Sequence, residues 1–168
     1  DYKDQSKPAD EDSTISYVRE IEKVFQKFNG PTYHTLGNHD MDSISKQHFL
    51  ANIKNTGISA DRSYYSFDAK GVHFIVLDAN FHPDGTDFDR GNFNWTQSCI
   101  PDFELDWLRK DLAAAKTPVI VFNHQLLDGG GNYYVDNAAA VRSILEDSEK
   151  VIAVFQGHQH KGNHSIIN

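Results

Sequence analysis

Residues 151–160 read "VIAVFQGHQH", an apolar run that stops at Gly157 and is followed by two histidines. Successive side chains of an extended strand point to opposite faces, so we expect His158 and His160 to emerge on the same side. Neutral imidazole is the commonest metal ligand among side chains. The stretch therefore predicts a buried strand with a metal-binding tip, although a polar loop after a buried strand would read the same way.

Two other predicted strands end in similar polar residues. Residues 32–36, "TYHTL", lead into "GNHD", and residues 118–122, "PVIVF", lead into Asn123 and His124. Ligands in α/β sheets gather at the carboxyl ends of strands. If the three strands share one sheet and one direction, one crevice receives the side chains of Asn38, His39, His124, His158 and His160.

Stretches with helical periodicity alternate with these strands. Apolar residues at helical spacing predict helices near residues 13–28, 43–55, 100–115 and 137–148, and residues 64–80 predict two strands joined by a turn. Ser13 or Thr14 is a suitable helix cap. Alternating strands and helices favour an α/β fold with a largely buried sheet.

Composition narrows the classes of partner. The 168 residues suit a single domain, and the net charge of -8 argues against binding a nucleic-acid duplex or an anionic membrane. The lone Cys99 excludes an internal disulfide framework and a thiolate zinc site. A phosphate recognised by this chain would therefore be met by a bound cation rather than by a basic patch.

In their order and separation, "GNHD" (37–40), "FNH" (122–124) and "GHQH" (157–160) resemble the signature of the calcineurin-like metallophosphoesterases. Residues 64–80 and 103–127 are similar to the branch that contains manganese-dependent ADP-ribose and CDP-alcohol diphosphatases. The resemblance implies a layered α/β/β/α sandwich with mixed sheets. It also implies that residues 1–168 are one domain truncated at both ends, without the family's Asp-x-His strand and C-terminal strands.

The resemblance implies two divalent metal ions, of manganese, iron or zinc. Asn38, His124 and His158 would bind one ion, and His160 would bind the other. Asp1 stands at a suitable distance before "GNHD" to be the family's bridging aspartate, although a solvated terminal acid is the alternative. The family's Asp-x-His motif occurs nowhere in the chain.

The resemblance also implies the chemistry. His39 would reach the phosphoryl oxygen or the leaving group, and Asp40 would orient the His39 ring. The reaction would be hydrolysis of a small phosphate mono- or diester, including pyrophosphate linkages of the nucleoside diphosphate type, by a metal-bridging hydroxide. Because Asp-x-His is absent, we expect the chain itself to be weakly active. A non-catalytic metal-binding module is the alternative.

Overall fold

The structure, a computed structural model, describes residues 8–128, 131, 132, 134–160, 162, 164 and 166. The helices of the described part are α1 (Glu11–Phe25), η1 (Asn38–Met41), α2 (Lys46–Leu50), η2 (Trp95–Gln97), α3 (Asp102–Ala114) and α4 (Ala138–Glu146). The strands are β1 (Tyr65–Ala69), β2 (Val72–Val76), β3 (Val119–Asn123) and β4 (Val151–Gln156).

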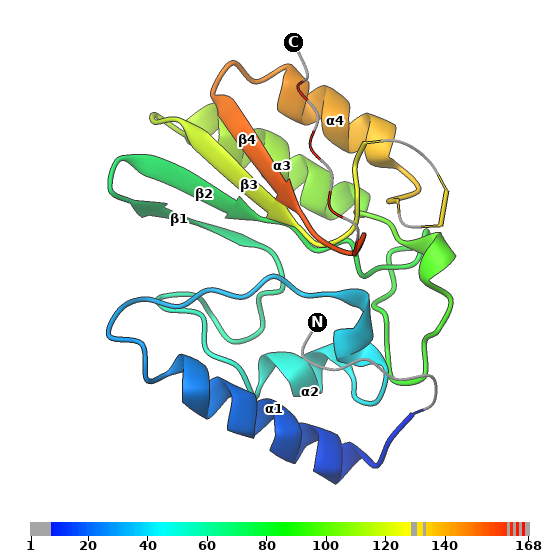
Figure 1. Ribbon diagram of the computed structural model, residues 1–168. Coiled ribbons are helices and arrows are strands. Elements are labelled where there is room, and N and C mark those ends of the chain that lie inside the picture. Colours follow the sequence, from blue (N-terminus) through cyan, green and yellow to red (C-terminus); the bar gives the residue numbers. More distant parts are fainter. Residues whose placement is uncertain are drawn as a thin grey trace.

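The strands form one mixed sheet in the order β1-β2-β3-β4 (Figure 1). β1 and β2 form an antiparallel hairpin, and β2, β3 and β4 run parallel to one another. The carboxyl ends of β2, β3 and β4 therefore meet at one edge of the sheet. The predicted α/β class with a mixed sheet is confirmed.

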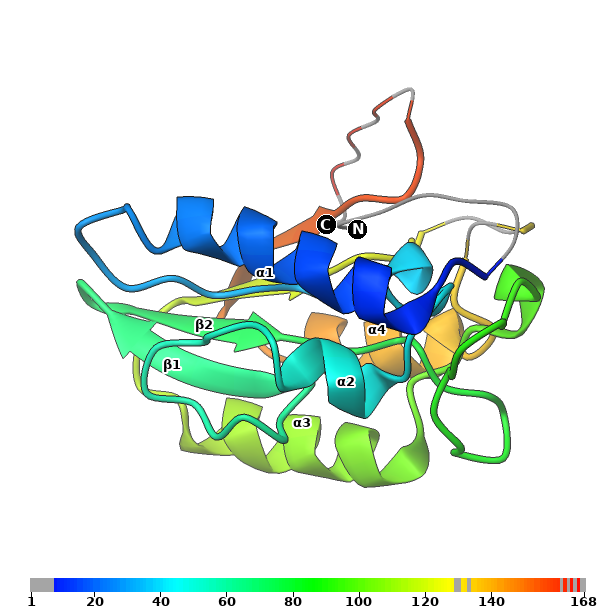
Figure 2. The ribbon, with the colours of Figure 1, turned by 90° about the horizontal axis from the view of Figure 1, so that it is seen from below.

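Helices α3 and α4 cover one face of the sheet, and the main core lies between them and the strands (Figures 1 and 2). Leu108 of α3 and Val141 of α4 are fully buried there, together with Val121 of β3. Burying a side chain of this size contributes about 1.5 to 3 kcal/mol. The core holds the connections β2-α3-β3 and β3-α4-β4 against the sheet.

The opposite face of the sheet carries an aromatic ladder that meets the extended segment 31–37. The ring of Tyr33 stacks on Phe67 of β1, with 3.5 Å between the ring centroids. The stacking continues across the strands through Phe74, Phe122 and Phe155. The segment that leads to Asn38 therefore packs on the sheet without being part of it.

The predicted strand at residues 32–36 is wrong, because no strand is assigned there in the described chain. Side chains satisfy its backbone groups instead. The His34 N–H donates to Asn55 Oδ1 at 2.8 Å, and the His34 carbonyl accepts from Tyr65 Oη at 2.8 Å. The segment is extended, but side-chain oxygens replace the neighbouring strand that a ladder needs.

The predicted helices are present with different bounds. Helix α1 is capped by Asp10, whose Oδ2 accepts from the Ser13 N–H at 2.9 Å, rather than by Ser13 or Thr14. The helix expected near residues 43–55 is shortened to α2, which Ser45 caps. None of the described helices has both the length and the apolar character needed to span a bilayer.

Candidate metal centre

The parallel pairing of β3 and β4 brings His124 and His158 together. Asn123 and Gln156 are paired at the ends of the two strands, and the Gly157 N–H donates to the His124 carbonyl at 2.9 Å. Nε2 of His124 then lies 3.1 Å from Nδ1 of His158. A Cβ at position 157 would lie 3.4 Å from His124 Nδ1, an ordinary van der Waals contact, so the His124 ring packs directly against the backbone of Gly157.

Asn38 approaches the two imidazoles from the end of the extended segment 31–37, which packs on the sheet face opposite to α3 and α4. It is the first residue of η1, its side chain is buried, and its Oδ1 lies 3.2 Å from His124 Nε2. Donor atoms around one divalent ion at metal–nitrogen distances of about 2.1 Å lie roughly 3.0 to 3.4 Å apart. The spacing of 3.1 and 3.2 Å around His124 Nε2 therefore fits ligands that share one cation.

The electrostatics of the cluster favour neutral imidazoles. Burial lowers the pKa of His124 to about 3 and that of His158 to about 4. The charges of His39 and His160 make smaller contributions to these same two shifts, so these rings lie within electrostatic range of the pair. A neutral ring nitrogen offers the lone pair that a metal ion needs. The pair is thus in its metal-binding protonation state across the neutral pH range.

The strand geometry expected for His158 and His160 is wrong. Strand β4 ends at Gln156, and the two histidines follow in a loop. His158 has φ +63°, a left-handed backbone conformation that a residue other than glycine rarely adopts. This turn directs the His158 ring to His124, whereas His160 is exposed. Strained residues are enriched at functional sites.

His39 has a different carboxylate partner from the one that we expected. Its Nδ1 lies 2.7 Å from Oδ2 of Asp42, whereas the Asp40 carboxylate accepts a hydrogen bond from the Gly37 N–H at 2.8 Å. Side chains three residues apart eclipse in a 3-10 helix, so η1 stacks Asp42 on His39 and turns Asp40 back to its own first turn. Asp42 rather than Asp40 therefore contacts Nδ1 of the His39 ring, and the spacing of three residues was the available signal.

The two other predicted ligands are Asp1 and the exposed His160. Asp1 lies outside the described residues. Within the described part of the chain, no three His, Cys, Asp or Glu side chains group in a way that could hold a metal ion. The site in the described chain therefore consists of two imidazoles and a carboxamide, with His39 and His160 nearby.

Known proteins share sequence similarity with most of this chain. Residues 1–162 match the family model described as calcineurin-like phosphoesterase. The chain is 27% identical over 192 residues to a manganese-dependent ADP-ribose/CDP-alcohol diphosphatase of Oryza sativa subsp. japonica, and the alignment covers 92% of the chain and 60% of that protein. A protein of the same name from Arabidopsis thaliana is 22% identical, with coverage of 92% and 61%. The chain thus spans about 60% of the length of these relatives.

Proposed function

The chain belongs to the calcineurin-like phosphoesterase family, and from this premise we propose that it hydrolyses a phosphate ester with divalent metal ions held by Asn38, His124 and His158. The single observation that carries the proposal is the convergence of three donor atoms, with His124 Nε2 within 3.2 Å of both other donors. We assign His160 and Asp1 to a second ion. When bound, such ions supply a water of lowered pKa and neutralise charge on the phosphoryl oxygens.

The residues of the chain have separate tasks in this reaction. Asn38 comes from the end of the extended segment and His124 follows β3, so together they would hold the metal where the segment and the sheet meet. His39 moves a proton at the phosphoryl oxygen or the leaving oxygen. Asp42 orients the His39 ring through its contact with Nδ1. Asp40 stabilises the turn through the Gly37 N–H.

For the substrate, we propose a small phosphoester with a pyrophosphate linkage, and for the metal we propose manganese. The rice and Arabidopsis relatives are both named manganese-dependent ADP-ribose/CDP-alcohol diphosphatase, and this name supports both choices. The net charge of -8 disfavours a nucleic-acid duplex as the substrate. An amide oxygen with two imidazoles also suits manganese better than a thiophilic metal.

The test is a titration of the metal-free chain with Mn²⁺, followed by an assay of ADP-ribose and CDP-alcohol hydrolysis. We expect saturable Mn²⁺ binding and slow turnover that His124→Ala abolishes. The control is His48→Ala, because His48 is exposed and pairs with Glu11 away from the cluster. A chain that binds no Mn²⁺ at millimolar concentration would overturn the proposal.

The second candidate function is a metal-binding module without catalysis. The observation in its favour is the absence of Asp-x-His from the chain. If the chain is such a module, it should bind Mn²⁺ saturably, as a metallophosphoesterase would. Its hydrolysis should be no faster than that of the His124→Ala variant. Adding the Asp-x-His segment of a relative in front of the chain should then leave hydrolysis unchanged, whereas it should raise the rate of a metallophosphoesterase.

A further inference from the structure

Asn80 connects the extended segment 31–37, which leads to Asn38, with the residues after β3, which include His124. It lies just beyond β2 and is completely buried. Its Nδ2 donates to the Leu36 carbonyl at 3.2 Å, and its Oδ1 accepts from Gln125 Nε2 at 2.7 Å. Leu36 is two residues before Asn38, and Gln125 directly follows His124. We propose that Asn80 is a positioning residue that sets the distance between Asn38 and His124.

The Asn80 amide has one orientation only. Nδ2 donates to both the Leu36 carbonyl and Asp78 Oδ1, the latter at 2.8 Å, and Oδ1 accepts from Gln125. Both N–H groups and the oxygen of the side chain are therefore used. A flipped amide would place oxygen against two acceptors. The side chain thus acts as a rigid spacer rather than as an adaptable polar group.

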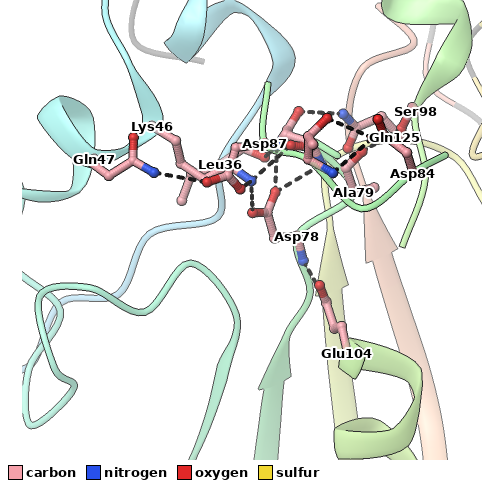
Figure 3. A network of polar contacts seen from close by, with 12 residues as sticks. Leu36, Lys46, Gln47, Asp78, Ala79, Asp84, Asp87, Ser98, Glu104 and Gln125 are labelled. Atoms are coloured by element: carbon pink, nitrogen blue, oxygen red, sulfur yellow. Dashed lines mark hydrogen bonds and ion pairs between the residues drawn. The ribbon is translucent and has the colours of Figure 1, made fainter. Parts of the chain in front are cut away.

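Asn80 is itself fixed by a buried ion pair, which Figure 3 shows around Asp78 and Lys46. Lys46 Nζ lies 2.8 Å from Asp78 Oδ2 and donates to the Asn80 carbonyl at 2.8 Å. The Asn80 N–H donates to Asp78 Oδ1 at 2.9 Å. Moving Asn80 would therefore disturb a charge pair that is shielded from water, and this fixes Asn80 in place.

This spacer matters because no ladder of backbone hydrogen bonds joins segment 31–37 to β2 or β3 in the described chain. The position of Asn38 relative to His124 therefore depends on side chains. Residues that hold metal ligands in place without touching the metal are worth about 10- to 100-fold in metal affinity or activity. The consequence for metal affinity rests on the proposed function, whereas the positioning itself does not.

The test compares Asn80→Ala with the matched control Asn137→Ala in the 168-residue chain. Asn137 also bridges backbone, since its Nδ2 donates to the Ile100 carbonyl at 2.6 Å and its Oδ1 accepts from the Ile100 N–H at 3.1 Å. In the metal-free chain, we expect Asn80→Ala to shift the ¹⁵N resonances of the His124 ring, and Asn137→Ala to leave them unchanged. In Mn²⁺ titration, we expect Asn80→Ala to weaken binding about tenfold.

Gln125→Met is the second variant. It removes the hydrogen bond from Gln125 to Asn80 Oδ1, which connects Asn80 to the neighbouring His124, and it leaves both donations from Asn80 Nδ2. It should shift the same ring resonances in a chain that unfolds at a temperature close to that of the wild type. Unchanged His124 resonances in folded Asn80→Ala and Gln125→Met chains would overturn the inference. Absence of Mn²⁺ binding by the wild type would instead overturn the proposed function, and the metal-free spectra would still decide the role of Asn80.

Discussion

Nε2 of His124 lies 3.1 Å from Nδ1 of His158, although 34 residues separate the two in the chain. Two neutral imidazoles at this distance share one proton between two nitrogens, or they turn both lone pairs to one cation. The contact depends on the paired ends of β3 and β4 and on the left-handed backbone of His158.

Replacing His158 by alanine should weaken Mn²⁺ binding at least 100-fold, because one of the three converging donors is removed. Isothermal titration of the metal-free chain measures this change. His158→Gly is the matched variant, since glycine accepts φ +63° without strain and also lacks the ring. Equal losses in the two variants would attribute the effect to the ring. Wild-type affinity in both variants would remove His158 from the metal site.

His39→Asn should retain Mn²⁺ while turnover falls by roughly 10² to 10⁴, the usual contribution of a general acid or base. Asp42→Asn should lower turnover by a smaller factor of about 10 to 100, because the ring stays in place but loses its carboxylate. Asp40→Asn is the control, since Asp40 contacts the Gly37 N–H rather than the ring. Metal content and initial rates measure all three. A larger loss in Asp40→Asn than in Asp42→Asn would reverse the assignment.

His73 should make the stability of the chain depend on pH. Burial favours the neutral ring, but the hydrogen bonds that the ring donates to Asp111 and Asp68, together with the charges of these carboxylates, outweigh burial and raise the pKa of His73 above 6.5. The folded state therefore holds this proton more tightly than the unfolded state. The stabilisation is complete below pH 6.5 and is lost as the pH rises through the raised pKa.

Urea unfolding at pH 6 and pH 9 measures this effect by comparing wild type with His73→Gln. The stability advantage of the wild type should shrink at the higher pH, because Asp111 and Asp68 then face a neutral ring. Asp111→Asn should flatten the dependence in the same way, since Asp111 Oδ2 lies 2.8 Å from His73 Nε2. An advantage that grows with pH would contradict the direction of the pKa shift.

Lys46→Met should destabilise the chain by about 3 to 5 kcal/mol, because Asp78 would keep a buried charge without its partner. Burial alone would raise the pKa of Asp78, but the Lys46 charge together with hydrogen bonds from Lys46, Asn80 and Ser63 outweighs burial and lowers that pKa. Lys116→Met is the control, since Lys116 is exposed. The free energy of unfolding in urea measures the difference. A loss no larger than that of Lys116→Met would show that the pair is not what holds Asp78.

Glu104→Gln should change stability by less than about 1 kcal/mol. Burial and the nearby Asp78 charge raise the pKa of Glu104 well above its ordinary value, so the carboxyl favours its neutral form. Glutamine keeps the oxygen that accepts from the Asp78 N–H. The same urea experiment applies, and a loss of several kcal/mol would indicate that Glu104 is ionised.

The sequence alone determined the α/β class, because apolar runs and helical periodicity are local properties of the chain. It also identified three polar clusters, and the paired ends of β3 and β4 place His124 beside His158. It wrongly predicted a strand at residues 32–36, since a strand requires a neighbouring strand and periodicity does not reveal one. The segment is extended, but Asn55 and Tyr65 satisfy its backbone.

Only the tertiary structure decided which residues support the site. Asp40 and Asp42 are equally plausible partners for His39 by composition, and the 3-10 turn selects Asp42 because it stacks residues three apart. Asn80 ends an apolar run like many other polar residues, and its role depends on Leu36 and Gln125, which are 44 and 45 residues away. Contacts over such separations depend on how the extended segment and the sheet pack together, and a local pattern of residue types does not predict that packing.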